Sequence, residues 1–286
     1  MQGLGNDYVY LTCMDRLPDC MPALARDISD RHFGVGGDGM VVITSSDVAD
    51  FRMIMFNADG SEAQMCGNAS RCIARLVYEK GLTQKTEFTL ETRAGIKKLK
   101  LNLRNGEIES ISVNMGRPFL NPEDIPVVPS AERHSSPCPP VVHDVSLGAE
   151  EEKVKVHCIG MGNPHGVIFL EPDESFFQKY GPLLERHDIW PEKANIEFVK
   201  VVGSDSIEMR VWERGTGETL ACGTGACASA VASALTGRTG REVTVKMKGG
   251  SLRIALDEND EVIMTGDACH IAQGIYFWNR KNESES

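Results

Sequence analysis

A duplicated local pattern constrains this chain more than any other feature of its sequence. In the first half, a strand-like segment and an Asp-Gly turn lead to Cys66, which stands at the beginning of a helix-like segment, 69–79. In the second half, the strand-like segment 209–212 leads in the same way to Cys222 and to a helix of small residues. The pattern predicts two related halves, each with one cysteine at the start of a helix.

The spacing of the two copies supports this interpretation. Each cysteine is preceded, nine residues earlier, by a polar residue: Asn57 in the first copy and Glu213 in the second. A Gly-apolar-Gly-Asn pattern also occurs twice, 157 residues apart, and the two cysteines are 156 residues apart. A period of half the chain predicts two domains on one plan rather than a solenoid of short repeats.

Composition and charge exclude several classes of protein. The chain has 286 residues, of which 41% are hydrophobic and 25% are charged, as in globular proteins with room for two cores. The net charge of -11, without a basic stripe, argues against a nucleic-acid partner. We find neither an apolar run of roughly 18 to 20 residues nor a signal-peptide pattern. We therefore expect a cytoplasmic protein that does not enter a membrane.

The cysteines and glycines do not predict a metal or a dinucleotide site. Nine cysteines without an export signal indicate free thiols in a reducing compartment. There is no Cys-x-x-Cys, and the spacings from Cys66 to Cys72 and from Cys222 to Cys227 are too long for a zinc knuckle. The loop 34–39 matches Gly-x-Gly-x-x-Gly, but it follows a helix and precedes a strand, the reverse of a dinucleotide-binding loop. We expect no metal and no cofactor.

Hydrophobic alternation predicts the rest of the architecture. Two sets of alternating segments each predict an antiparallel meander: 87–92, 96–103 and 108–114 in the first half, and 243–247, 251–256 and 262–265 in the second. We therefore predict an α/β (α+β) fold of two pseudo-symmetric domains, each a curved, mostly antiparallel sheet around a central helix.

The expected domains divide the chain near residue 117. The first half comprises 1–117 and also 267–286, because 268–278 has the pattern of a strand that returns to it. The second half comprises 118–266. Within it, 122–152 is rich in proline, serine and acidic residues and is interpreted as a surface excursion.

The position of the cysteines indicates a chemistry. Unpaired N–H groups and the helix dipole at a helix start stabilise a thiolate, and they also bind a carboxylate. Two such starts that face each other could hold one carboxylate between two thiols. One thiolate would then remove the proton from the neighbouring α-carbon, and the other thiol would return a proton to the opposite face. The pattern therefore predicts inversion at an α-carbon.

At this point the motifs resemble a known family. They are Gly3-Leu4-Gly5-Asn6-Asp7, the segments 30–36 and 56–62, Met65-Cys66-Gly67-Asn68, the segment 161–165, and 213–225 with its Ala221-Cys222-Gly223-Thr224. As a set they resemble the diaminopimelate epimerase family. The resemblance implies a homodimeric enzyme independent of pyridoxal phosphate that interconverts LL- and meso-diaminopimelate for lysine and peptidoglycan precursor biosynthesis.

The resemblance also assigns site residues. It implies that Cys66 and Cys222 are the catalytic acid and base, with Glu213 and His165 tuning the thiols. Backbone N–H groups would bind the reacting carboxylate, from Gly67, Asn68, Gly223 and Thr224. The rest of the substrate would be bound by Glu213 at the α-ammonium, by Arg214 at the distal carboxylate, and by Asn6, Asn57, Asn163 and Asn195.

Three other functions remain open at this stage. A racemase of the same fold could act on a smaller amino acid. A cysteine hydrolase could use one thiol with His165 and an asparagine, in which case the second cysteine would be dispensable. A thiol redox protein is the third alternative, and the lack of Cys-x-x-Cys argues against it.

Overall fold

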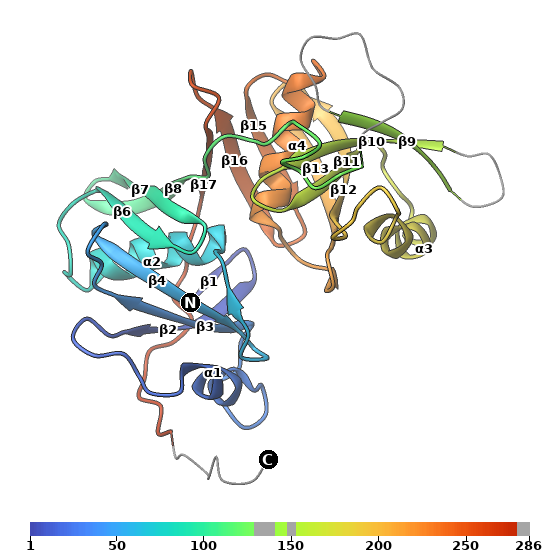
Figure 1. Ribbon diagram of the computed structural model, residues 1–286. Helices are drawn as coiled ribbons and strands as arrows, with labels where there is room; N and C mark the ends of the chain where they lie inside the picture. Colours follow the sequence, from blue (N-terminus) through green and yellow to red (C-terminus); the bar gives the residue numbers. More distant parts are fainter. Residues whose placement is uncertain (129–140, 148–152, 279–286) are drawn as a thin grey trace. The chain divides into compact units, whose positions relative to one another are not determined.

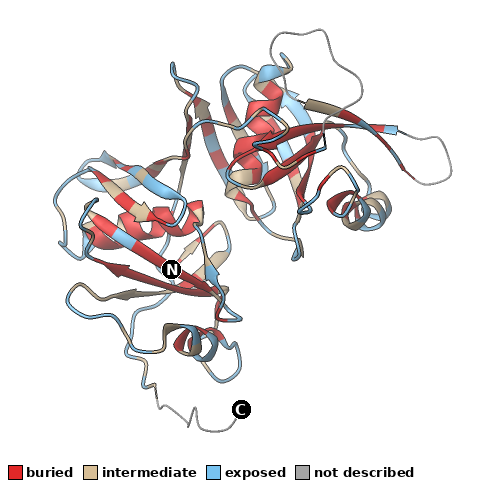
Figure 2. Cartoon of the chain, in the orientation of Figure 1, coloured by how far each residue is buried: buried red, intermediate tan, exposed pale blue. Residues whose placement is uncertain are grey.

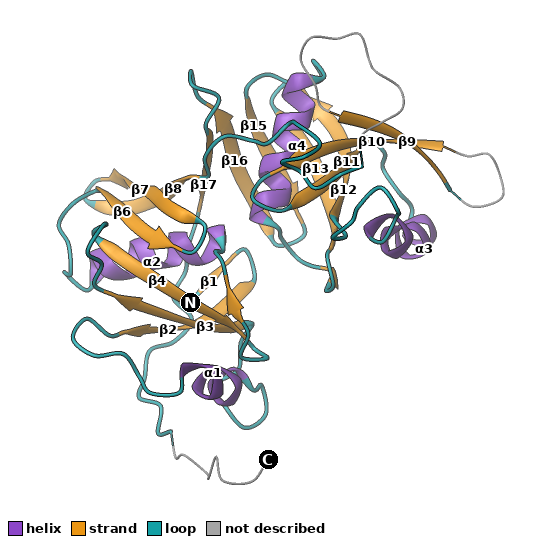
Figure 3. Cartoon of the chain, viewed as in Figure 1, coloured by secondary structure: helices purple, strands orange, loops and turns teal. Residues whose placement is uncertain are grey.

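Strands dominate the architecture, and few helices accompany them. The computed structural model describes residues 1–128, 141–147 and 153–278 (Figure 1). The chain divides into two compact units: an N-terminal unit of Met1–Ile111 with the segment that begins at Asp267, and a C-terminal unit of Ser112–Gly266. The predicted halves divided the chain six residues later, after residue 117. The mixed α/β class is confirmed (Figure 3).

The N-terminal unit has a mixed sheet and two helices. Its elements are β1 Gln2–Gly3, β2 Asn6–Thr12, α1 Met21–Ser29, β3 Gly39–Thr44, β4 Phe51–Asn57, β5 Glu62–Ala63, α2 Gly67–Glu79, β6 Glu87–Thr92, β7 Gly95–Arg104 and β8 Glu107–Asn114, the last of which runs into the C-terminal unit. β2 pairs with β3 in parallel, β3 with β4 antiparallel, β4 with β6 in parallel, and β6 with β7 antiparallel.

β3 is the central strand of this unit because both of its faces are apolar. Met40 and Val42 pack against α1, while Val41 and Ile43 point to the opposite face and are equally buried. A strand covered on both faces has a continuous apolar sequence rather than an alternating one. The two helices of the unit lie on opposite sides of it (Figure 1).

The C-terminal unit contains β9 Val141–Ser146, β10 Lys153–Gly160, β11 Pro164–Ile168, α3 Glu174–Glu185, β12 Asn195–Gly203, β13 Ser206–Glu213, β14 Gly217–Glu218, α4 Gly223–Leu235, β15 Glu242–Met247, β16 Gly250–Leu256 and β17 Val262–Gly266. β9, β10 and β11 form an antiparallel series. β11 pairs with β12 in parallel, β12 with β13 antiparallel, β13 with β15 in parallel, and β15 with β16 antiparallel.

The strand pairings of the N-terminal unit recur in the C-terminal unit. Both contain the series parallel, antiparallel, parallel, antiparallel, over β2, β3, β4, β6 and β7 in one and over β11, β12, β13, β15 and β16 in the other. In both, the third strand pairs with a two-residue strand, β5 or β14, just before a helix of 13 residues, α2 or α4. The two cysteines therefore occupy equivalent places in a repeated β–β–α arrangement.

Helix α4 is the buried centre of the C-terminal unit (Figure 2). Its alanines at 226, 228, 230 and 232 are completely buried, and the helix contacts β10 to β13 and β15 to β17. Small side chains let a sheet approach the helix closely from several sides. No helix in the part of the chain that the structure describes is both long and apolar enough to cross a membrane.

Two expectations from the sequence need correction. The segment 268–278 was predicted as a strand, but it makes only an isolated bridge between Cys269 and Gln2. The excursion 122–152 contains a regular strand, β9, which pairs with β10. This strand was overlooked because the surrounding segment is rich in proline and acidic residues. Within Val141–Ser146 itself, buried and exposed residues alternate from His143 onward. The parts of this excursion at 129–140 and 148–152 lie outside the described residues.

Candidate active site

Cys66 caps helix α2 in the N-terminal unit. Its backbone is extended (φ -137°, ψ 124°), so the chain turns from the β5 hairpin into the helix at this residue. The Sγ atom lies 3.3 Å from Oδ1 of Asn6 on β2. Asn6 is oriented by Asp38, whose Oδ2 accepts a hydrogen bond of 2.7 Å from Nδ2 of Asn6. Two of the predicted site residues, Asn6 and Cys66, are therefore in contact.

Opposing effects act on the Cys66 thiol. Burial is the largest of them and raises its pKa. The backbone N–H groups of Ala69 and Asn68, at the open start of α2, lower the pKa again, and the guanidinium of Arg71 does the same. The helix start thus stabilises the thiolate against the cost of burial.

The other predicted residues of this unit surround the same helix start. Asn57 ends β4, and its Nδ2 donates to Oγ of Ser61 at 3.0 Å across the turn. Asn68 is only 4% exposed, and its Oδ1 accepts from Arg71 at 2.7 Å. The Asn68 side chain is thus hydrogen-bonded to another residue of the same helix. The N–H groups of Gly67 and Asn68 belong to the first turn, where no acceptor from a preceding turn exists.

Cys222, at the start of α4, has carboxylates near its thiol, which Cys66 does not. Its Sγ accepts from the N–H of Gly225 at 3.4 Å and lies 3.5 Å from Oγ1 of Thr224. Burial raises the pKa of the Cys222 thiol well above its usual value, and the carboxylates of Glu213 and Glu197 raise it further. The pKa of Glu213 is itself raised, mainly by burial. Burial and the two carboxylates therefore all disfavour the Cys222 thiolate.

Glu213 is oriented by the hairpin that follows it. It ends β13, and its Oε1 accepts a short hydrogen bond from Oγ1 of Thr219. The Cys222 thiol also bonds to it, which lowers the pKa of the carboxyl against the effect of burial. The turn after β13 thus places the predicted α-ammonium ligand beside the second cysteine.

His165 forms a buried pair with Glu197. Both side chains are completely buried, and Nδ1 of His165 lies 2.7 Å from Oε1 of Glu197. The other ring nitrogen, Nε2, lies 3.0 Å from Oδ1 of Asn163. Both nitrogens are therefore occupied, so that in this arrangement His165 does not serve Cys222 as a general base. This geometry argues against the cysteine hydrolase.

The side chain of Asn195 is hydrogen-bonded to the backbone of Arg214. The parallel register of β11 and β12 places Asn195 opposite His165. Its Oδ1 accepts from the N–H of Arg214 at 2.8 Å, which fixes the chain just after β13. The Arg214 side chain is 38% exposed, and NH1 donates to the carbonyl of Glu192 at 3.2 Å. A guanidinium with this exposure is accessible to a carboxylate ligand.

Sequence reasoning missed two carboxylates that orient predicted residues. Asp38 fixes Asn6, and Glu197 binds His165. Glu197 had a signal, because an acidic residue within the apolar run Ile196 to Val199 must be buried with a partner. Asp38, in a glycine loop, had no such signal.

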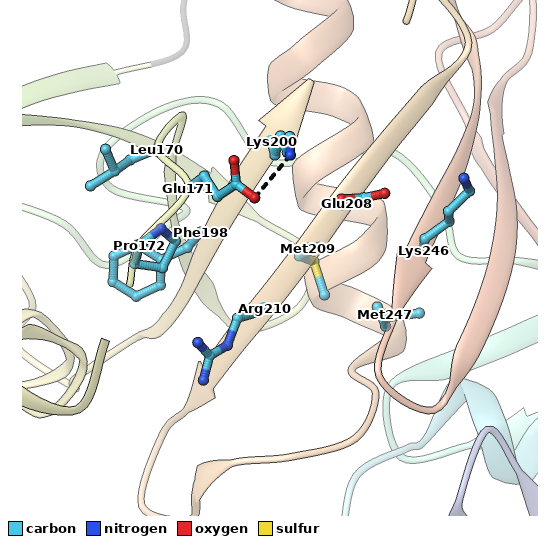
Figure 4. A pocket seen from close by; sticks show the side chains of 10 residues that line it. All are labelled: Leu170, Glu171, Pro172, Phe198, Lys200, Glu208, Met209, Arg210, Lys246 and Met247. Carbon is cyan, nitrogen blue, oxygen red and sulfur yellow. Dashed lines mark hydrogen bonds and ion pairs between the residues drawn. The ribbon is translucent and has the colours of Figure 1, made fainter. Parts of the chain in front are cut away.

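A pocket of about 370 Å³ in the C-terminal unit is not the predicted site. Figure 4 shows that it opens over β12, β13 and β15, where it is lined by residues such as Lys200, Glu208 and Arg210. Lys200 pairs with Glu171 at 2.9 Å, and Arg210 pairs with Glu218 at 2.8 Å. These two cations therefore already have carboxylate partners. None of the predicted site residues lines this pocket.

Comparisons with known proteins agree with the motifs. The family model described as diaminopimelate epimerase matches residues 1–120 and 157–271. The chain is 47% identical over 276 residues to a diaminopimelate epimerase of Methanococcus maripaludis, which covers 96% of this chain and 97% of the relative. It is 46% identical to one of Acetivibrio thermocellus, with 96% of both chains covered.

Among solved structures, the fold is similar to that of a methylitaconate-delta-isomerase. The TM-score is 0.67, at 12% sequence identity, over 99% of this chain and 97% of the other. At this identity the likeness concerns the fold alone.

Proposed function

The chain belongs to the diaminopimelate epimerase family, and we propose that Cys66 and Cys222 are the two acid–base groups with which it inverts its substrate. It is an amino-acid epimerase that interconverts LL- and meso-diaminopimelate. The observation that carries the two-thiol proposal is the repeated β–β–α arrangement, which puts one cysteine at each equivalent helix start.

The proposed reaction is a proton transfer on each face of the α-carbon. One cysteine, as the thiolate, takes the α-proton, so that the C–H bond breaks and an S–H bond forms. The electron pair is delocalised into the adjacent carboxylate, and the other cysteine gives its thiol proton to the opposite face. The N–H groups of Gly67, Asn68, Gly223 and Thr224 stabilise the carboxylate as its charge increases. After the reaction the protonation states of the two thiols are exchanged.

The remaining polar residues bind the substrate. Glu213 accepts from the α-ammonium, an assignment supported by its burial beside Cys222. Arg214 pairs with the distal carboxylate in two parallel hydrogen bonds. Asn6, Asn57, Asn163 and Asn195 provide the amide groups that a second zwitterion requires when it leaves water. His165 and Glu197 hold Asn163 and set the charge near Cys222.

We also propose that the enzyme is a cytoplasmic homodimer. All eight cysteines of the described residues are free thiols, as in a reducing compartment. Ile271, Ile275 and Phe277 are 62%, 83% and 83% exposed on the returning segment, a surface that a second copy could cover. Light scattering of the wild type and of Ile275→Glu would test this; a monomeric wild type would overturn it.

Proton NMR in deuterated water tests the function. The reduced wild type should replace the α-proton of LL- and meso-diaminopimelate by deuterium while it interconverts the isomers. Cys66→Ala and Cys222→Ala should each abolish interconversion, by at least about a thousandfold. Cys269→Ala, which removes an exposed cysteine, is the matched control and should remain active.

Each other outcome contradicts a defined part of the proposal. Interconversion that survives in either single variant would overturn the two-thiol mechanism. Wild-type enzyme that exchanges no α-proton of either isomer, but does exchange that of a smaller amino acid, would identify a racemase with another substrate.

A further inference from the structure

A buried guanidinium lies behind the first catalytic cysteine. Arg71 is on α2, five residues after Cys66, and is 0% exposed. Its Nε donates to the carbonyl of Asp267 at 3.0 Å, and its NH2 donates to Oδ1 of Asn68 at 2.7 Å. It therefore joins the returning segment to the first turn of α2, where the proposed carboxylate-binding N–H groups are located.

The guanidinium is confined from several directions. A Cβ atom at Gly3, on β1, would stand only 3.2 Å from NH2 of Arg71, a tight contact that leaves the guanidinium little room on this side. One turn further along α2, NH1 of Arg75 donates to the carbonyl of Ala268 at 2.9 Å. Both arginines thus hold the returning segment, but of the two only Arg71 also bonds to Asn68.

The C-terminal unit lacks this cation at the equivalent place. Five residues after Cys222 stands Cys227, which is completely buried and carries no positive charge. Carboxylates act on Cys222 instead, from Glu213 and Glu197. The two repeats therefore give their cysteines opposite electrostatic surroundings.

The other titratable groups near the two thiols do not reverse this contrast. Cys66 has Cys72 on its own helix and Tyr10 on β2, both uncharged when protonated, and Asp38 acts on it through Asn6. Cys222 has His165 beyond Glu213, but His165 is paired with Glu197. Among full charges, the largest effect on the pKa thus comes from a cation, Arg71, for Cys66 and from a carboxylate, Glu213, for Cys222.

We propose that Arg71 is a positioning residue that fixes the start of α2 through Asn68 and makes Cys66, rather than Cys222, the thiol that ionises first in the substrate-free enzyme. This rests on the proposed two-thiol function. Ionising Cys66 costs its bond to Oδ1 of Asn6, a contact with a neutral dipole. Ionising Cys222 would place a second full negative charge beside Glu213, and the repulsion of two charges in a buried site is the larger penalty.

The test is the pH dependence of alkylation of the substrate-free enzyme by iodoacetamide, followed by peptide mass spectrometry. The midpoint of each profile reports the pKa of one cysteine, independently of how accessible it is. In the wild type, the midpoint of Cys66 should lie at least about one pH unit below that of Cys222. In Arg71→Gln, the midpoint of Cys66 should rise by about one unit, a tenfold slower alkylation at a fixed pH below it.

Two further variants separate charge from structure. Arg71→Lys keeps the charge and should restore most of the wild-type midpoint. Arg75→Gln loses the contact with the returning segment but not the one with Asn68, and it should leave the midpoint unchanged. A wild-type Cys222 midpoint below that of Cys66, or equal shifts in Arg71→Gln and Arg75→Gln, would overturn the proposal, and the wild-type measurement needs no variant to fold.

The function proposal fails on a different result. If Cys66→Ala still interconverted the isomers, the two-thiol mechanism would be wrong, even with the Arg71 effect on Cys66 alkylation intact. If both cysteines are essential and the midpoints do not respond to Arg71, only the role of Arg71 is wrong.

Discussion

Nδ1 of His165 lies 2.7 Å from Oε1 of Glu197, and neither side chain is exposed to solvent. The second oxygen, Oε2 of Glu197, is buried without a hydrogen-bond partner among the described residues. A buried carboxylate that is only partly satisfied is costly to the fold. Here its negative charge raises the pKa of Cys222. The pair thus links the stability of the C-terminal unit to the protonation of Cys222, one of the two proposed acid–base groups.

Glu197→Gln should destabilise the protein while it makes Cys222 more acidic. The amide makes a weaker hydrogen bond to Nδ1 of His165 than the carboxylate does, and the free energy of unfolding should fall by about 1–3 kcal/mol. Urea unfolding measures this change. Glu208→Gln, on the exposed face of β13, is the matched control and should stay within about 0.5 kcal/mol of the wild type. A variant as stable as the wild type would show that the pair contributes nothing to the fold.

Glu213→Gln should lower the pKa of Cys222. The Glu213 carboxylate is the largest charge effect on that thiol after burial, and removal of a negative charge favours the thiolate. Peptide-resolved alkylation against pH should show the Cys222 midpoint shifted downward and that of Cys66 unchanged. Turnover should fall at least about a hundredfold because the α-ammonium loses its acceptor. An unchanged Cys222 midpoint would contradict the placement of Glu213 beside it.

Gly225→Ala should disturb the surroundings of Cys222. A Cβ atom there would lie 2.6 Å from Oε1 of Glu197 and 3.2 Å from Sγ of Cys222. We expect overpacking to cost about 1–3 kcal/mol, which exceeds the helix propensity gained, and kcat to fall with it. Gly274→Ala, where a Cβ meets nothing within 4 Å, is the control for calorimetry and kinetics. Equal behaviour of the two variants would refute the crowding at 225.

His157 should make the fold sensitive to acid. Burial lowers its pKa from 6.5 to about 4, with smaller effects from Arg238 and Lys155. The folded state therefore prefers neutral His157, and its contribution is complete above pH 6.5 and is lost as the pH falls toward 4. The loss reaches about 3 kcal/mol at most. Urea unfolding at pH 7 and pH 4.5 should show a smaller difference in His157→Phe than in the wild type.

The control for this measurement is His270→Gln, which removes a partly exposed histidine that is paired with Glu79. This variant should still lose stability in acid, because His157 remains in place. If His157→Phe matched the wild type, the ring would titrate in the folded protein as freely as it does in the unfolded chain.

Two helices and one C-terminal segment show which parts of the fold could be predicted from the sequence. Both cysteine-led helices could be predicted, α2 with a start at residue 69 against the observed Gly67, and α4 directly after Cys222. The Cys-Gly pairs, the spacings and the small residues are all local signals. The segment 268–278 was predicted wrongly because alternating apolar residues also occur where a chain crosses a surface without a neighbouring strand.

The sequence by itself was sufficient to identify the duplication, the two cysteines at helix starts and the family. Short motifs at fixed spacings can be recognised in a sequence without a structure. Only the tertiary structure decided the charges around each thiol. Arg71 and Cys227 hold equivalent positions after the two cysteines, but only Arg71 brings a charge. Arg71 is held by the carbonyl of Asp267, and the carboxylate of Glu197 acts on Cys222; both partners lie far along the chain from the residues they affect. Electrostatic energy depends on the distance between charges and on the local dielectric constant, and the sequence alone gives neither of them.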